Sequence, residues 1–246
     1  MTVRWLDAGD GALTLEFGDV ITPALVAQVA VLEHAVRAAQ ARGDLTGLVE
    51  AVPTFRSLTL IYDPLRTTRA ELDPAVRALL DGPATPDLTA PRRWHLPASY
   101  GGSAGADLAD VSAATGLTAD AVVALHTATT FTVCMLGFMP GFAFMGGLPE
   151  ALSMPRRREP RLRVPAGTLA ITGPLTAVYP WESPGGWQLI GHCPVPLFDA
   201  RCSPPALLAP GDEVRFVETP TVRCIELAAA LRAGELAAAS FQDCAT

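Results

Sequence analysis

Hydrophobic and polar positions alternate in the first part of the chain and then change to a helical period. Hydrophobic residues at every second position of residues 13–17 predict a half-buried strand. Thr22 and Pro23 follow as an N-cap and a proline at the first helical position, and Gly43 ends the predicted helix. The buried face of this helix is expected to consist of Leu25, Val29, Leu32 and Val36.

Two further strands and a second helix complete the first predicted domain, residues 1–80. Residues 49–52 and 57–62 have the short apolar pattern of strands, with Pro53 in the turn between them. Residues 68–80 have a helical period, and the buried face is expected to consist of Leu72, Val76 and Leu79. The order strand, helix, strand, strand, helix is that of a small split βαβ sandwich.

A change in composition separates this domain from the rest of the chain. Residues 81–91 include three prolines in eleven positions, which predicts a linker. In the second domain, residues 92–220, short strands with Gly and Pro turns surround one helix at 118–128, which predicts a closed or nearly closed β-barrel. Residues 222–239, within the C-terminal segment 221–246, are Ala-rich and predict a terminal helix across the barrel or at an interface. The expected fold class is α+β.

The composition excludes several kinds of chemistry. The chain has 246 residues, is 50% hydrophobic and carries a formal net charge of −7, which argues against sequence-independent binding of nucleic acid. All 18 basic residues are arginines, so a Schiff-base lysine, a Walker-A lysine and a biotin-carrying lysine are impossible within this chain. Nucleotide or biotin chemistry would have to come from a partner.

The cysteines and the apolar runs indicate a cytoplasmic protein without a metal site. The five cysteines form no C-x-x-C pair and have no zinc-site spacing with histidine, so reduced and mostly buried thiols are expected. The N-terminus lacks the apolar region of a signal peptide, and no apolar run reaches the length of a membrane span. We therefore expect a cytoplasmic location and no contact with a membrane.

The densest set of polar and aromatic groups lies between Val164 and Trp187, where two loops rich in Gly and Pro bracket short β-type runs. This pattern is typical of a binding face on a β scaffold. Arg161 and Arg163 would share one face of a strand there, where an anion site and a solvated surface are both open interpretations. For the neighbouring Arg156, Arg157 and Arg158, contact with solvent is the favoured interpretation.

Two histidines and a glutamate are candidates for handling protons. His126 lies at the end of the predicted helix, on the rim of its buried face, where the helix dipole favours the protonated form. A structural role is the simpler interpretation of His126. His192 follows the loop that carries Glu182 and Ser183, so Glu182 and His192 are candidates for proton transfer, with packing as the alternative for His192.

Residues 131–147 are rich in aromatic residues and methionine, which is typical of a barrel core rather than a cofactor pocket. The turn at 139–142 could form one wall of a cleft. No G-x-S-x-G motif surrounds Ser183, so the sequence does not predict a serine hydrolase.

Long, ordered motifs run through nearly the whole chain. They are Pro53-Thr54-Phe55-Arg56-Ser57, Tyr100-Gly101-Gly102, His126-Thr127-Ala128, Leu136-Gly137-Phe138-Met139-Pro140-Gly141-Phe142, Arg161-Leu162-Arg163-Val164-Pro165-Ala166-Gly167, Tyr179-Pro180 and Glu182-Ser183-Pro184-Gly185-Gly186-Trp187. These motifs closely resemble those of the KipI / 5-oxoprolinase B-subunit family, also called allophanate hydrolase subunit 1.

The resemblance implies a cyclophilin-like barrel, the domain type found in the carboxyltransferase part of urea carboxylase. It also implies two partners: the C subunit of 5-oxoprolinase, a paired subunit with a related cyclophilin-like barrel, and the A subunit. Together these proteins open 5-oxoproline to glutamate at the expense of ATP. The chain itself would hold no cofactor, and ATP with Mg would be bound through the partner subunits. Opening a stable lactam calls for anion-binding arginines and a general base.

On this basis the candidate catalytic residues are Glu182 and His192. The candidate substrate-binding residues are Arg161, Arg163, Tyr179, Ser183, Gly185, Gly186, Gln188 and His126. The chain departs from the family pattern at Ser103, where an acidic residue is usual, and at Leu175 and Ala177, where Gln and Gly are usual. Two other functions remain open: an inhibitor that binds a histidine kinase, and a carboxyltransferase or allophanate-hydrolase-type component of urea metabolism.

Overall fold

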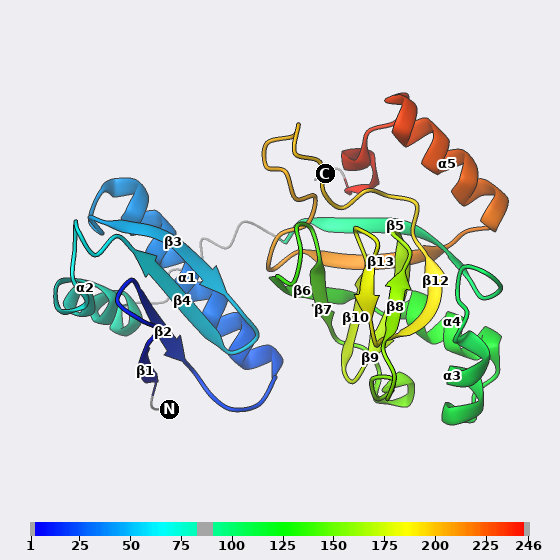
Figure 1. Cartoon of the computed structure of the whole chain (residues 1–246), viewed down its shortest axis with the longest axis horizontal. Helices are drawn as coiled ribbons and strands as arrows, with labels where there is room; N and C mark the ends of the chain where they lie inside the picture. Colours follow the sequence, from blue (N-terminus) through cyan, green and yellow to red (C-terminus); the bar gives the residue numbers. More distant parts are fainter. Residues whose placement is uncertain (1–2, 83–90, 244–246) are drawn as a thin grey trace. The chain divides into compact units, whose positions relative to one another are not determined.

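The computed structural model describes residues 3–82 and 91–243. The chain divides into two compact units, Met1–Ala90 and Pro91–Thr246 (Figure 1). Each unit has its own hydrophobic core. Most of the predicted linker, residues 81–91, lies outside the described residues.

The N-terminal unit is a four-stranded antiparallel sheet with the order β1-β2-β4-β3, combined with two helices. Its elements are β1 (Arg4–Asp7), β2 (Ala12–Glu16), α1 (Pro23–Arg42), β3 (Leu48–Pro53), β4 (Ser57–Tyr62) and α2 (Arg69–Asp81). β2 and β3 flank β4 on opposite sides, which is the predicted split βαβ arrangement. The prediction did not include β1, because three of its four residues are exposed and give no apolar alternation.

The helices of this unit begin where the sequence predicts. The side chain of Thr22 accepts a hydrogen bond from the backbone N–H of Leu25, and Gly43 ends α1 in the left-handed conformation, with φ of 84°. Thr68 and Glu71 form a capping box at the start of α2. The predicted inward residues of both helices are buried or half-buried in the core of this unit.

The C-terminal unit is a closed barrel with the strand order β10-β7-β6-β13-β5-β12-β9 (Figure 1). Its strands are β5 (Arg93–Tyr100), β6 (Phe131–Leu136), β7 (Ala143–Gly146), β9 (Thr168–Thr172), β10 (Leu175–Val178), β12 (Gln188–His192) and β13 (Glu213–Glu218). The α+β class and the barrel are thus confirmed. Two short strands, β8 (Arg161–Val164) and β11 (Ser183–Gly185), pair only with each other and form a separate ribbon.

Helices accompany the barrel. They are α3 (Leu108–Thr115), α4 (Ala119–Ala128) and α5 (Thr221–Ala233), with the 3-10 turns η1 (Glu150–Leu152) and η2 (Ala238–Phe241). α4 confirms the helix expected at 118–128, whereas α3 was not predicted. The terminal helix α5 is shorter than predicted, because Gly234 adopts a left-handed conformation and its N–H bonds back to the last turn.

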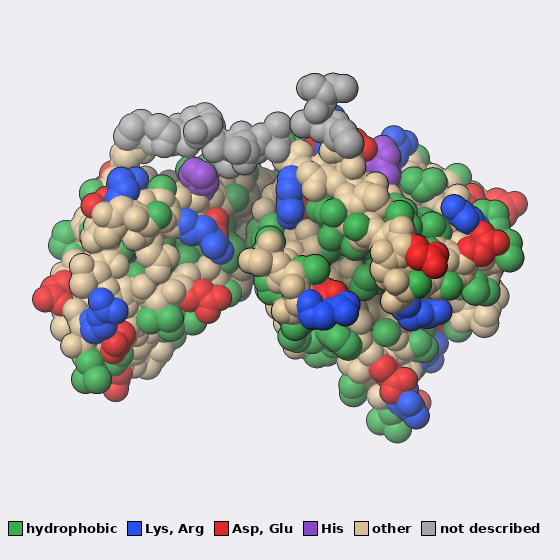
Figure 2. Space-filling view, turned by 90° about the horizontal axis from the view of Figure 1, so that it is seen from above, with side chains coloured by type: hydrophobic (Ala, Val, Ile, Leu, Met, Phe, Trp, Pro, Cys, Tyr) green, Lys and Arg blue, Asp and Glu red, His purple; other side chains and the backbone are tan. Residues whose placement is uncertain are grey.

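Within the described ranges no single helix is long and apolar enough to cross a membrane, and α3 and α4 meet that criterion only as a pair bent by 94°. On the face drawn in Figure 2, arginine and acidic side chains are interspersed. Many of the surface charges form ion pairs, such as Arg201 with Asp199 and Arg223 with Glu226.

Candidate functional site

The ribbon of β8 and β11 carries two of the predicted arginines. Its register shifts, so that three residues of β11 span four residues of β8, and such an irregularity breaks the strict alternation of faces. Arg161 therefore contacts the buried Asp107, whereas the side chain of Arg163 is 78% exposed and pairs with Glu182. The expected common face for Arg161 and Arg163 is not observed, because the two side chains pair with different carboxylates.

Asp107 is the centre of a buried polar cluster that the sequence analysis did not include. Its Oδ1 accepts hydrogen bonds from Nη2 of Arg161 and from Nη1 of Arg157, the latter at 3.3 Å. Its Oδ2 accepts the backbone N–H of Leu189 at 2.7 Å. The side chain of Asp107 is 3% exposed, and two guanidinium groups beside this one carboxylate leave one positive charge in excess.

Arg157 was expected to be solvated, and the structure corrects this interpretation. Its side chain is 34% exposed because the guanidinium turns inward to Asp107. A single aspartate at the start of a short helix predicts an N-cap, but the side chain of Asp107 makes no cap hydrogen bond to α3. Local sequence therefore carries no signal for this pairing, which joins positions fifty residues apart.

Three donor atoms of this cluster are buried and have no hydrogen-bond partner among the described residues. They are Nε of Arg157, Nη1 of Arg161 and Oγ of Ser183. A buried donor without an acceptor costs about 1–3 kcal/mol, and more when the group is charged. Because folded proteins satisfy most of their buried polar groups, these atoms mark a position that suits an acceptor. The predicted residue Ser183 lies on β11 opposite Val164 of β8, the strand that also carries Arg161.

Tyr179 and Gly185 define the inner side of the ribbon. A Cβ atom on Gly185 would lie 2.4 Å from the hydroxyl oxygen of Tyr179, so this close approach requires glycine. Tyr179 is buried, and its ring packs edge-on against Phe142 with centroids 5.2 Å apart. Burial raises the pKa of Tyr179, so the phenol stays protonated at neutral pH.

Gly186 and Gln188 hold the segment that brings Arg157 into place. The carbonyl of Gly186 accepts the backbone N–H of Arg157 at 2.7 Å. The side-chain amide of the buried Gln188 donates to the carbonyl of Pro155 at 3.0 Å. Both predicted residues therefore contact the arginine-bearing segment 155–161.

Glu182 lies on the outer part of this region. Its carboxylate accepts a hydrogen bond from Nε of Arg163 at 2.9 Å, and Nη2 of Arg163 forms an ion pair with the same oxygen at 2.7 Å; the side chain of Glu182 is 50% exposed. Trp181 beside it donates its indole N–H to the carbonyl of Pro140, so the turn at 139–142 adjoins the loop that carries Glu182. Glu182 is open to solvent and to a ligand.

His192 lies at the far end of β12 and packs against the loop that follows β8. A Cβ atom on Gly167 would lie 2.4 Å from Nε2 of His192, and Gly167 has a φ of 80°. Burial lowers the pKa of His192, although a hydrogen bond to the backbone of Ala166 opposes this shift. His192 is therefore neutral at pH 7 and can accept a proton. No hydrogen bond or ion pair joins His192 to Glu182 in the described part of the chain.

His126 lies in the barrel core rather than on the rim of a helix. It has no exposed surface, and its ring packs between Phe131 and Phe216. Thr176 donates its hydroxyl proton to the carbonyl of Ala170, so it accepts Nε2–H of His126, and Nδ1 then accepts the hydroxyl of Tyr100.

This position corrects the expected charge of His126. Burial lowers its pKa to about 3, so the effect of the helix dipole does not prevail and the ring stays neutral. With both ring nitrogens bonded and no exposed surface, His126 has no free atom for a substrate. His126 therefore has a structural role in the barrel core.

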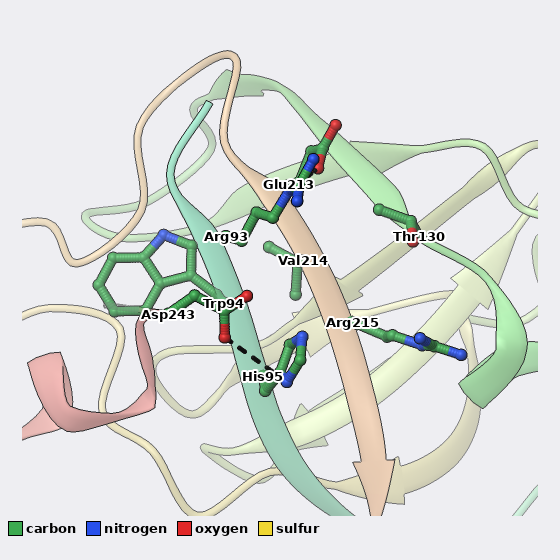
Figure 3. A pocket seen from close by; sticks show the side chains of 8 residues that line it. All are labelled: Arg93, Trp94, His95, Thr130, Glu213, Val214, Arg215 and Asp243. Carbon is green, nitrogen blue, oxygen red and sulfur yellow. Dashed lines mark hydrogen bonds and ion pairs between the residues drawn. The ribbon is translucent and has the colours of Figure 1, made fainter. Parts of the chain in front are cut away.

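A hollow of about 350 Å³ lies elsewhere on the unit, over the paired strands β5 and β13 (Figure 3). Arg93 and Arg215 line it together with Glu213 and Asp243, and His95 faces Asp243 at 3.7 Å. Charges of both signs lie there: Arg93 pairs with Glu213, and Arg215 donates to the carbonyl of Thr127. We therefore place the candidate site at the ribbon. Among the described residues there is no group of three or more His, Cys, Asp or Glu side chains that could hold a metal ion.

The chain is similar to known proteins over most of its length. Residues 3–208 match the family model described as carboxyltransferase domain, subdomain C and D. A relative from Escherichia coli O157:H7, named as the B subunit of 5-oxoprolinase, is 43% identical over 211 residues, which cover 85% of this chain and 93% of the relative. The chain belongs to the 5-oxoprolinase B-subunit family. The resemblance noted in its motifs is thereby confirmed.

Solved structures share the fold of this chain. The crystal structure of TTHA0988 matches with a TM-score of 0.75 and 36% identity, over 89% of this chain and 40% of that chain. This chain thus spans less than half the length of TTHA0988. The urea carboxylase of Kluyveromyces lactis matches 93% of this chain and 23% of its own, with a TM-score of 0.71 and 19% identity, which shows a shared fold.

Proposed function

We propose that this chain is the B subunit of an ATP-dependent 5-oxoprolinase that opens 5-oxoproline to glutamate. The near full-length similarity to a protein named as the B subunit of 5-oxoprolinase carries this proposal. The half-buried Arg157 and Arg161 beside Asp107 support it, because the substrate is an anion. The partners are the C and A subunits of the enzyme, and the isolated chain is inactive.

In the proposed reaction, water adds to the lactam carbonyl carbon, the ring C–N bond breaks, and the nitrogen takes up a proton. ATP, held with Mg by the partner subunits, would supply the activation of the carbonyl oxygen by transfer of its γ-phosphoryl group, with ADP and phosphate as the products. This chain orients the substrate through its arginines and supplies a base to the attacking water. Glu182 and His192 are the candidate bases, since Glu182 is half-exposed and His192 is neutral at pH 7.

The absence of lysine supports dependence on partners. All 18 basic residues are arginines, so a phosphate-binding lysine of the Walker-A type must come from another chain. Of the alternatives, a carboxyltransferase role fits less well, because the urea carboxylase likeness extends to the fold alone. The cytoplasmic location stays a prediction.

Reconstitution tests this function. The purified chain is mixed with its cognate C and A subunits, and glutamate released from 5-oxoproline is measured with and without ATP. We expect ATP-dependent release from the mixture of all three proteins and none when this chain is left out. Hydrolysis by the chain alone, or equal activity of a mixture that lacks it, would contradict the proposal.

A further inference from the structure

The cluster around Asp107 has the charge and the donors to bind one carboxylate. Arg157 and Arg161 contribute two positive charges, and Asp107 neutralises one of them. The remaining single charge matches a carboxylate better than a phosphate dianion. The backbone N–H of Leu189 already occupies the second oxygen of Asp107, so this carboxylate is fixed and holds the two guanidinium groups in one orientation.

The free donors of the cluster are suited to a planar acceptor. Nε of Arg157, Nη1 of Arg161 and Oγ of Ser183 are buried and have no partner in the described ranges. A carboxylate has two oxygens and about four lone-pair sites, enough to accept all three donors. Both side chains are partly exposed, 34% for Arg157 and 24% for Arg161.

We propose that Arg157, Arg161 and Ser183 form a subsite for the carboxylate of a small-molecule substrate, with Asp107 as the residue that positions the two arginines. This inference rests on the proposed function for the identity of the substrate, 5-oxoproline, and the subsite itself is defined by a carboxylate on a compact ring. Arg163 is not part of the subsite, because its guanidinium pairs with Glu182 on the outer side.

The ribbon carries Arg161 and Ser183, two of the three residues of the subsite. β8 and β11 pair only with each other, so a small shift of the ribbon breaks no hydrogen bond of the barrel ladder. Gly185 and Gly186 keep β11 thin where it passes Tyr179 and Pro160.

The test compares two lactams that differ only in the carboxylate. The complex of this chain with the C and A subunits, without ATP, is titrated calorimetrically with 5-oxoproline and with 2-pyrrolidinone, which lacks the carboxylate. We expect at least about tenfold tighter binding of 5-oxoproline, since one charge-assisted hydrogen bond contributes a factor of about ten or more. Equal binding of the two lactams, or no binding of 5-oxoproline, would overturn the subsite.

Variants then test which residues cause the tighter binding of 5-oxoproline. Arg161→Gln and the smaller change Ser183→Ala should each reduce the preference for 5-oxoproline, while Arg201→Gln, at an exposed arginine paired with Asp199, should leave it unchanged. Ser183→Ala keeps the pairing of both arginines with Asp107, so it reports on binding even if Arg161→Gln folds poorly. If both variants still prefer 5-oxoproline as strongly as the wild type does, the proposed subsite is refuted.

The outcomes separate this inference from the proposed function. Normal 5-oxoproline turnover with an unchanged preference in both variants would refute the subsite and leave the function standing. A preference lost in the variants of a complex that never opens 5-oxoproline would support the subsite and refute the function. If Ser183→Ala, which keeps the pairing of both arginines with Asp107, instead dissociates the complex, seen by size-exclusion chromatography, a partner's carboxylate fills the subsite and the substrate assignment is wrong.

Discussion

Asp107 and Leu189 hydrogen-bond to each other in both directions. The backbone N–H of Asp107 donates to the carbonyl of Leu189 at 2.8 Å, and the backbone N–H of Leu189 donates to the Asp107 carboxylate at 2.7 Å. This pair joins the start of α3 to β12 and fixes a carboxylate between two arginines. The arginine cluster therefore depends on the barrel wall for its geometry, not on the ribbon alone.

Replacing this carboxylate should destabilise the C-terminal unit. Asp107→Asn keeps the size of the side chain but leaves two guanidinium groups without a counter-charge, so we expect the free energy of unfolding to fall by at least about 2 kcal/mol. Urea denaturation followed by fluorescence measures the change. Glu226→Gln, in an exposed pair with Arg223, is the control and should have no measurable effect. Equal stabilities of Asp107→Asn and the wild type would show that the cluster is not coupled to folding.

The hydrogen bond between Tyr100 and His126 should contribute to stability in the barrel core. Tyr100→Phe removes the hydroxyl that lies 2.9 Å from Nδ1 of His126 and leaves a buried acceptor without a donor. We expect a loss of about 1–3 kcal/mol in the free energy of unfolding. Tyr62→Phe is a matched control, since the Tyr62 hydroxyl makes no hydrogen bond within the described residues. Similar losses in both variants would contradict the assigned network.

The buried His126 should make the protein sensitive to acid. In the folded state its pKa is lowered to about 3 from a usual value of 6.5, so the unfolded chain binds an additional proton between these pH values. Stability is therefore full above pH 6.5 and falls as the pH drops, with a slope that approaches about 1.4 kcal/mol per pH unit from this group. Urea midpoints measured from pH 7 to 4 test the slope. NMR of the ring carbons should show neutral His126 at pH 5, and a charged ring there would refute the assignment.

The sequence predicts the elements whose signals are local. The cap at Thr22, the left-handed stop at Gly43 and the helix at 118–128 were all expected, because capping and periodicity involve residues within a few positions of each other. β1 and α3 were not expected, since a four-residue exposed strand and an eight-residue helix without a side-chain cap have weak local patterns. Long-range packing decides such elements.

The contacts of the candidate site depend even more on residues far apart in the sequence, so local patterns predict them poorly. The loop around Ser183 was identified because turn residues and polar groups gather there in sequence. Asp107 was not, because its partners lie fifty or more residues away. The expected sharing of a face by Arg161 and Arg163 failed for a different reason: strand alternation assumes a regular register, and the shift between β8 and β11 cannot be seen in one strand's sequence.

Glu182 and His192 should differ in their effect on turnover. In the reconstituted complex we expect Glu182→Gln or His192→Ala to lower kcat by roughly a hundredfold or more, according to which residue is the base, with near-normal folding. If His192 is the base, kcat should fall as the pH drops below its lowered pKa, since protonation removes the acceptor. Full activity of both variants would show that neither residue transfers a proton.

At position 138 a glycine variant should be more stable than an alanine variant, which is the reverse of the order in a helix or strand interior. Its φ of 68° lies in the left-handed region, and its side chain is 67% exposed, so its edge contact with Phe142 is the main packing that it would lose. Both Phe138→Gly and Phe138→Ala remove that contact, but only glycine relieves the backbone strain, which is worth about 1 kcal/mol or more for other residues. We therefore expect Phe138→Gly to have the higher free energy of unfolding of the two in urea denaturation. A helix or strand interior favours alanine by roughly 0.5–1 kcal/mol, so a more stable alanine variant would mean that the turn after β6 does not hold the left-handed conformation in solution.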